Sequence, residues 1–400
     1  MKKYDIVFIL PGVSWRFPPG GFDIIYRLAN NLNSNLIKTA IVFLKNPPRY
    51  IPHYKLDPNL TKKYTLEKKI FDKIFSVINV SYFFKLISKL NLTDYDYSIL
   101  NNTDLYYFEY TDDFHFDAKI IFATLWETAY YVNELRKKRM FNAYYLIQNS
   151  EDDPSFSGDN SVNAAQTYNF NFKKVVINKK LLDRFISDDP LFFHVGIDTD
   201  FYKVLDNTQK EFDVLFSLRN NPSKGYKYAF DAIKELLNSV KDIRIAAFGD
   251  FKPNKLPFEI SKISYYYIPT RKKLRELYNS SKIFVLPSLV EGMSLPPLEA
   301  MSCGAAVVAT DNGGVNEYLI DGFNGIMIPV GCSVCIVDAV IDLLHDNAKR
   351  ERLVLNGLST ATNFSYSKMC YNFAQLMKHE LNLETDFIGN GEESKTLDLK

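Results

Sequence analysis

One stretch in the last third of this 400-residue chain constrains its fold more than any other. Two short apolar runs, residues 283–287 and 305–310, are bounded by turn residues, and such runs predict buried strands. Pro296 and Pro297 lie between them and predict the first turn of a helix, where the missing proline N–H would have had no partner. The stretch therefore predicts a strand–loop–helix–strand unit of a parallel sheet.

Two carboxylates lie in the connection between these predicted strands. Glu291 lies on the loop that leaves the first strand, Glu299 is expected in the first helical turn, and Ser294 or Leu295 is expected to cap the helix. Ligands bind open parallel sheets at the carboxyl ends of the strands, and a helix N-terminus attracts phosphate. An anion site is one interpretation. In the other, Glu299 only complements the helix dipole and Glu291 only contacts solvent.

The pattern around these carboxylates resembles that of a known family. It reads E-G-M-S-L-P-P-L-E-A-M over residues 291–301, an E-x7-E spacing, and continues through Asp311-Asn-Gly-Gly and the glycine turns that end at Gly325. This is similar to retaining GT-B glycosyltransferases of the glycosyltransferase family 4 type. The resemblance implies an α/β chain with two Rossmann-like domains facing across a cleft. It also implies a C-terminal helix that crosses back to the first domain.

The length of the chain agrees with two or more domains. We expect an acceptor domain at residues 1–202, completed by the crossing helix at residues 366–383. We expect the donor domain at residues 211–365, after a polar linker without periodicity. Residues 384–400 are polar and are expected to be disordered.

A second group of charged residues follows the first predicted strand of the donor domain. The resemblance assigns Arg219 and Lys224 to the donor diphosphate and names them, with Glu291, as the catalytic set. A leaving diphosphate needs fixed cations, and arginine offers a planar fork where lysine offers a point charge. The resemblance also implies that Glu299 holds the ribose hydroxyls of the donor. The alternative is that both cations are ordinary exposed loop residues.

A glycine pair at residues 20–21 follows the first predicted strand, residues 4–10. The G-x-G-x-x-G fingerprint of dinucleotide-binding proteins is absent from the sequence here. The pair resembles the Gly-Gly loop that opens the N-terminal domain in the same family, where it approaches the donor diphosphate. The resemblance thus assigns Gly21, together with Ser294 and Leu295, to donor binding. A simple turn without a ligand is the alternative.

The acceptor side of the cleft is predicted from two further strand ends. Trp126 and Thr128 follow the strand at residues 119–124, where many relatives place a histidine that this chain lacks. Trp126 either stacks on a sugar ring or belongs to the interior. Gln148 ends the next strand and offers an amide to acceptor hydroxyls.

Charge and cysteine content exclude several other classes. The formal net charge of +1 predicts no nucleic-acid footprint. The D-x-D patterns at residues 94–96 and 198–200 are interpreted as turns, so neither a metal nor another cofactor is expected. Cys332 and Cys335 form a C-x-x-C pattern that we interpret as two half-buried thiols rather than a redox or metal pair. The cysteine spacing shows no secreted framework, which favours a cytoplasmic location.

Residues 62–90 are rich in lysine and aromatic side chains. Such a segment can lie on an anionic membrane surface and would then make a peripheral membrane contact. We favour the other interpretation, a pair of helices with a solvated lysine face. No apolar run reaches the ~20 residues that span a bilayer.

The function hypothesis is a retaining hexosyltransferase. It moves a sugar from a nucleotide-diphosphate-sugar donor to a hydroxyl of a glycan or lipid-linked acceptor, in cell-surface polysaccharide or glycoconjugate assembly. Two alternatives stay open: a non-catalytic GT-B binding subunit of a glycan-assembly complex, and a sugar-nucleotide epimerase of GT-B fold. A nucleic-acid-modifying glucosyltransferase is disfavoured by the neutral charge.

Overall fold

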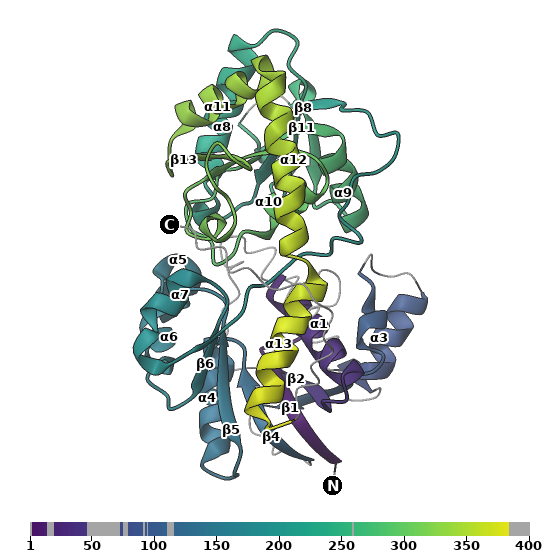
Figure 1. Cartoon of the computed structure of the whole chain (residues 1–400), viewed down its shortest axis with the longest axis vertical. Coiled ribbons are helices and arrows are strands. Elements are labelled where there is room, and N and C mark those ends of the chain that lie inside the picture. The colour runs from purple at the N-terminus through teal and green to yellow at the C-terminus, as the bar shows by residue number, and fades with distance from the viewer. Residues whose placement is uncertain are drawn as a thin grey trace, which may run out of the picture.

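The computed structural model describes residues 2–13, 20–45, 73–74, 79–90, 93, 95–109, 116–257 and 260–383. The chain forms two α/β domains, one above the other in Figure 1. Each domain is built on one parallel sheet with helices packed against it.

The first sheet has seven parallel strands in the order β3-β2-β1-β4-β5-β6-β7. Their bounds are β1 Lys2–Leu10, β2 Thr39–Lys45, β3 Asp104–Glu109, β4 Phe116–Ala123, β5 Asn142–Ile147, β6 Lys173–Val176 and β7 Leu191–Phe192. The helices are α1 Gly20–Ser34, α3 Val80–Lys89, α4 Trp126–Arg136, α5 Pro154–Ser157, α6 Ser161–Thr167 and α7 Lys179–Arg184. The central strands are continuous apolar runs, as is usual where helices bury both faces of a sheet.

The second sheet has six parallel strands in the order β10-β9-β8-β11-β12-β13. Their bounds are β8 Phe212–Leu218, β9 Ile245–Gly249, β10 Ser264–Tyr267, β11 Ser281–Leu286, β12 Ala306–Thr310 and β13 Ile326–Ile328. The helices are α8 Tyr226–Ser239, α9 Arg271–Asn279, α10 Leu295–Ser302, α11 Ser333–His345, α12 Asn347–Asn363 and α13 Tyr366–Glu380. Short 3-10 turns fill the remaining connections: η2 Tyr97–Leu100, η3 Gly158–Asn160, η4 Ile186–Asp188, η5 Pro222–Lys224, η6 Pro253–Lys255, η7 Ile260–Lys262 and η8 Val315–Glu317.

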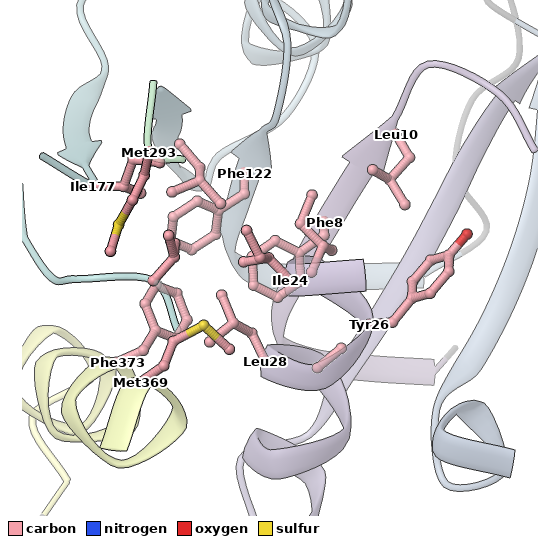
Figure 2. Close-up of a cluster of buried hydrophobic side chains, with 14 of the residues drawn as sticks. Phe8, Leu10, Ile24, Tyr26, Leu28, Phe122, Ile177, Met293, Met369 and Phe373 are labelled. Carbon is pink, nitrogen blue, oxygen red and sulfur yellow. The ribbon is translucent and has the colours of Figure 1, made fainter. Parts of the chain in front are cut away.

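The last helix, α13, leaves the second domain and packs on the first, as expected for the crossing helix (Figure 1). At the crossing, Ile197 forms an isolated β-bridge with Ser365, so the two chain segments that join the domains lie side by side. Figure 2 shows Met369 and Phe373 of α13 against Phe122 of β4, in a cluster of buried side chains. Met293 of the second domain lies in the same cluster, so one apolar core spans both domains.

A part-buried ion-pair network also joins the domains. In α1, Arg27 pairs with Asp23 at 3.1 Å, and it pairs with Asp198 of the interdomain segment at 3.2 Å. Arg271, the first residue of α9, lies 3.6 Å from the same Asp198 carboxylate. The Tyr366 hydroxyl of α13 donates a hydrogen bond to Asp23. Opposite charges from three segments and a hydroxyl from a fourth meet here, which fixes how the domains face each other.

The structure corrects the interpretation of the C-x-x-C pattern. Cys332 and Cys335 are joined by a disulfide and are not two separate thiols. Cys303 and Cys370 are free and buried.

Much of the lysine-rich segment 62–90 lies outside the described residues. Its described part is mainly α3, which buries Phe83, Phe84 and Ile87 and exposes Lys85 and Lys89. Among the described residues no helix is both long and apolar enough to cross a bilayer.

Candidate active site between the two sheets

The order of the second sheet shows where a ligand would bind. From β8 the chain builds outward to β9 and β10, and from β11 it builds in the opposite direction to β12 and β13. Ligands bind such sheets in the crevice beyond the carboxyl ends of the two strands at this reversal. The segment with Arg219 and Lys224 leaves β8, and the segment with Glu291 leaves β11. The predicted catalytic residues therefore lie at the reversal point of the sheet.

Lys224 and Glu291 form the centre of this site. The ammonium of Lys224 is 2.8 Å from Glu291 Oε2, and the buried Ser288 hydroxyl donates to Glu291 Oε1 at 2.8 Å. The side chains of Lys224 and Glu291 are 32% and 17% exposed. Both carboxylate oxygens are thus oriented, while the cation keeps donors that can turn toward an anion.

A glycine allows the two loops to meet this closely. Gly225 follows Lys224 with φ +65°, and a Cβ placed on it would lie 1.8 Å from the carbonyl oxygen of Pro287. Beside this contact, the Leu289 N–H donates to the Ser223 carbonyl at 2.7 Å. Only glycine permits both the positive φ and the backbone approach, so this turn sets where Lys224 and Glu291 lie.

Arg219 lies at the outer side of the same loop. Its guanidinium is 3.6 Å from Asp250, which follows β9, and its side chain is 58% exposed. The Asp250 carboxylate also accepts a hydrogen bond from the Asn220 N–H. In this structure Arg219 therefore pairs with Asp250 and not with the Lys224–Glu291 centre.

The N-terminus of α10 faces the same crevice. Ser294 is its cap residue, as expected, and Leu295 begins the helix. The Ser294 hydroxyl donates to Asn312 Oδ1 at 3.2 Å and makes no capping bond to its own helix. Gly20, the first residue of α1, lies opposite: a Cβ on it would be 4.0 Å from Leu295 Cδ1. The N-termini of α1 and α10 thus converge, and the N-terminus of a helix suits a phosphate.

Glu299 does not lie in the first turn of α10, as the sequence had suggested. The helix begins earlier, at Leu295, and its first turn has no acidic residue. The Glu299 carboxylate accepts a hydrogen bond from the Tyr278 hydroxyl at 3.1 Å. Burial raises the pKa of Glu299 to about 7, although the nearby Arg271 guanidinium and the Tyr278 hydrogen bond favour its charged form. Near neutral pH this carboxyl group can therefore gain or lose a proton.

The loop after β11 touches the first domain. The Asn178 side-chain amide, after β6, donates to the Gly292 carbonyl at 2.6 Å. A Cβ on Gly292 would lie 2.3 Å from the Gln148 carbonyl oxygen, so the first domain fits tightly against this loop. The buried Glu317 carboxylate accepts from the Lys179 N–H at 2.7 Å and lies 3.0 Å from His194 Nε2. Contacts between domains therefore help to place the segment that carries Glu291.

Of the three residues predicted for the acceptor side, Gln148 lies at the interdomain crevice. A Cβ on Gly21 would be 3.0 Å from Gln148 Oε1, so the glycine pair and this amide adjoin. Trp126 is only 4% exposed and packs edge-on against Tyr130. Thr128 is fully buried, and its hydroxyl accepts from the N–H groups of Thr124 and Leu125. In this structure Trp126 and Thr128 therefore shape the start of α4 and are not open to a ligand.

Two buried carboxyl groups, Glu127 and Glu151, lie at the start of α4 and after β5. Glu151 Oε2 accepts hydrogen bonds from the Trp126 N–H at 2.6 Å and from the Tyr145 hydroxyl at 2.8 Å. No described residue donates to Glu151 Oε1 or to Glu127 Oε2, and both oxygens are buried. Burial raises the pKa of Glu127 to about 8 and also raises that of Glu151, to which the Glu127 charge contributes. Glu127 is therefore protonated over much of the range below pH 8.

Glu127→Gln is expected to remove a pH-dependent destabilisation. The folded pKa of about 8 exceeds the ordinary value of 4.5, so between these values the folded state holds more protons than the unfolded state. Stability then falls as the pH rises through this window. The substitution should raise the free energy of unfolding at pH 8 by on the order of 2–4 kcal/mol and change it little at pH 5.

Urea unfolding at both pH values measures this difference. Glu134→Gln is the matched control, because Glu134 lies on the same helix in an exposed pair with Lys137. An equal pH dependence in wild type and in Glu127→Gln would contradict the assignment.

Several residues of the site were not predicted from the sequence. Ser288, Asp250, Tyr278 and Arg271 orient the predicted charges. Asp250 follows β9 directly and Ser288 lies two residues after the end of β11, so the strand-exit rule could have indicated them. Tyr278 and Arg271 come from α9 and gave no local signal. Among the described residues, no group of three or more His, Cys, Asp or Glu side chains is placed to hold a metal ion.

Comparisons with known proteins agree with this arrangement. Residues 198–359 match the family described as Glycosyl transferases group 1. An uncharacterized glycosyltransferase of Methanocaldococcus jannaschii is 29% identical over 153 residues, which are 37% of this chain and 42% of that protein. The N,N'-diacetylbacillosaminyl-diphospho-undecaprenol alpha-1,3-N-acetylgalactosaminyltransferase of Campylobacter jejuni is 25% identical over 190 residues, 46% of this chain and 50% of that protein. The chain thus spans about half or less of the length of these curated relatives.

The similarity of fold extends over nearly the whole chain. The crystal structure of Anabaena HepE in complex with UDP and glucose matches with a TM-score of 0.68 at 14% identity. The match covers 95% of this chain and 100% of that one. At this identity the likeness shows the fold alone. The chain has the GT-B fold, and residues 198–359 match the family described as Glycosyl transferases group 1.

Proposed function

We propose that this protein is a glycosyltransferase that moves a sugar from a nucleotide-diphosphate-sugar donor to a hydroxyl of a glycan or lipid-linked acceptor. The observation that carries the proposal is the Lys224–Glu291–Ser288 cluster at the reversal point of the second sheet, facing the N-terminus of α10. The Glycosyl transferases group 1 match over these residues supports it. The names of the two relatives support the hexosyltransferase class (EC 2.4), and we propose the family 4 type.

The reaction needs stabilisation of a departing diphosphate. As the bond between the anomeric carbon and the phosphate oxygen breaks, negative charge grows on the diphosphate and positive charge on the anomeric carbon. Lys224, Arg219 after leaving Asp250, and the N–H groups at Leu295 would face the first charge, and Glu291 would face the second. Gly21 allows the diphosphate to approach the first domain.

We propose retention of the anomeric configuration by attack on the face that the leaving group occupies. The acceptor oxygen forms its bond to the anomeric carbon, and its proton passes to the departing phosphate oxygen. No side-chain nucleophile is then required, and no metal ion is part of the proposal. Gln148 is the residue of the first domain that we assign to the acceptor, because it adjoins Gly21.

Donor affinity is expected to increase as the pH rises through about 7. We assign Glu299 to the ribose hydroxyls, which donate hydrogen bonds best to a charged carboxylate. Since burial raises the pKa of Glu299 to about 7, most of the free protein has the neutral carboxyl at pH 6. If only the charged form binds, the dissociation constant should be about tenfold lower at pH 8 than at pH 6. Calorimetric titration at both pH values measures this ratio, and Glu299→Gln should remove the pH dependence. A wild-type affinity that does not change with pH would contradict the role of Glu299.

The proposed activity is tested with a panel of UDP-, GDP-, dTDP- and ADP-sugars. Thermal stabilisation by one donor, with slow release of its nucleoside diphosphate and no effect of EDTA, is the expected result. An isomerised sugar nucleotide without transfer or hydrolysis would indicate an epimerase. Failure of every donor to stabilise the protein would contradict donor binding.

We also propose a cytoplasmic location, because the free buried Cys303 and Cys370 suit a reducing compartment. Peripheral contact with a membrane through residues 62–90 is the alternative that liposome flotation decides. The described lysines of α3, Lys85 and Lys89, are exposed. Flotation with anionic vesicles would show the contact, and its absence would leave these lysines as a solvated face.

A further inference from the structure

The Cys332–Cys335 disulfide lies apart from the residues to which we assign the sugar transfer. It joins the residue just before α11, at the end of the loop that follows β13, to the first turn of α11. The loop that it closes contains only Ser333 and Val334. A disulfide constrains the unfolded chain least when its loop is short, so this bond contributes little to the stability of the fold. The other two cysteines, Cys303 and Cys370, are buried and unpaired. One short disulfide beside two free thiols does not resemble the disulfide framework of a secreted scaffold.

The surroundings of Cys332 suit a thiolate. Cys332 is the cap residue of the 13-residue helix α11, and its sulfur accepts a hydrogen bond from the Cys335 N–H at 3.1 Å. The N–H groups and the positive dipole end of a helix stabilise a sulfur anion, which makes a cysteine there a good leaving group and nucleophile. On reduction, the same N–H would remain in place to receive the charge.

The pair can also be reached from solvent. Both cysteines are partly exposed, Val334 between them is 65% exposed, and Val330 just before them is 45% exposed. A reactive disulfide needs such access, because exchange requires a thiolate to approach one sulfur along the axis of the S–S bond.

We infer that Cys332 and Cys335 form a reversible dithiol–disulfide site that exchanges with a cellular dithiol. A thiolate of the reductant attacks the Cys335 sulfur, the S–S bond breaks, and Cys332 leaves as the thiolate. The second thiol of the reductant then displaces Cys335 from the mixed disulfide. The protein gains two electrons and two protons, and the reductant is oxidised to its own disulfide.

The site also adjoins the helix that follows Lys224. Gly331 precedes Cys332 with φ +75°, and a Cβ on it would lie 3.3 Å from the ring of Tyr228 in the first turn of α8. A change in the conformation of residues 331–335 would therefore alter the contact between Gly331 and Tyr228 of α8. The redox chemistry itself depends only on the two sulfurs and would hold whether or not the protein transfers sugars.

The test is a redox titration of the native protein. The protein is equilibrated in buffers with graded ratios of reduced to oxidised dithiothreitol, the free thiols are blocked with iodoacetamide, and the labels are located by peptide mass spectrometry. The expected result is that Cys332 and Cys335 gain their labels together, reversibly, as the ratio rises. Cys303 and Cys370 should stay unlabelled until the protein is denatured, and so serve as internal controls.

Two outcomes would overturn the inference. In one, Cys332 and Cys335 are labelled even in the most oxidising buffer, so no disulfide forms. In the other, they remain unlabelled in excess dithiothreitol, so the disulfide is structural. Cys332→Ser is the matched variant, because serine can cap α11 as the cysteine does. It should leave Cys335 labelled in every buffer with an unchanged melting temperature, whereas loss of the fold would indicate that the disulfide is structural.

Discussion

Glu291→Gln is expected to keep the fold and to lower the turnover about 100- to 1,000-fold, as the removal of one preorganised electrostatic group does in other active sites. The amide has the size of the carboxylate but cannot stabilise positive charge at the anomeric carbon. It also loses the 2.8 Å ion pair that fixes Lys224. Initial rates of nucleoside diphosphate release at saturating donor measure the effect, and the melting temperature checks the fold.

Glu134→Gln serves again as the matched control for this variant. Glu134 pairs with Lys137 at 2.7 Å, much as Glu291 pairs with Lys224, but on the exposed surface of α4. The same chemical change there should leave the rate unaltered. A Glu291→Gln enzyme that works within a fewfold of wild type would contradict the role of Glu291.

Gly225→Ala is expected to destabilise the second domain strongly. A Cβ would lie 1.8 Å from the Pro287 carbonyl oxygen, which is a backbone atom that no side-chain rotation can move. The loop that carries Lys224 and the loop that carries Glu291 must then separate. We expect a loss of about 4 kcal/mol or more in the free energy of unfolding, from overlap added to the strain of positive φ. Urea unfolding measures this loss, and donor binding should disappear with it.

Gly322→Ala is the control that separates the effect of steric overlap from the strain of a positive φ. Gly322 has φ +70°, close to that of Gly225, but no atom lies within 4 Å of its added Cβ. Its replacement should destabilise the protein by only about 1–2 kcal/mol, the strain of the left-handed conformation alone. Equal losses in the two variants would show that the approach of the two loops is not tight.

The parts of this fold that the sequence predicted well are local ones. Buried strands β11 and β12 were expected as residues 283–287 and 305–310, and they are Ser281–Leu286 and Ala306–Thr310. Apolar runs bounded by turn residues carry their own signal. The family resemblance assigned Lys224 and Glu291 to one site, and the structure brings them together beyond the carboxyl ends of β8 and β11.

The features that could not be predicted from the sequence depend on packing between residues that are far apart in the chain. Thr128 looked open to a ligand at a strand end, yet it is buried because its hydroxyl caps the start of α4. The prolines predicted a helix that begins at Pro296 with Glu299 in its first turn, but the helix begins one residue earlier, at Leu295, and Glu299 falls just beyond that turn. Contacts such as the one between Asn178 and Gly292 join residues more than a hundred positions apart, and no local sequence pattern predicts them.

Hydrogen exchange with and without the stabilising donor is the most direct test of where the donor binds. Backbone N–H groups that bind phosphate, or lie beneath it, exchange more slowly when the donor is present. We predict protection at residues 219–226, at residues 288–299 and at the start of α1 near Gly21. Those segments form the two sides of the proposed crevice. Protection confined to other segments, or no change at a donor concentration that saturates binding, would contradict the site.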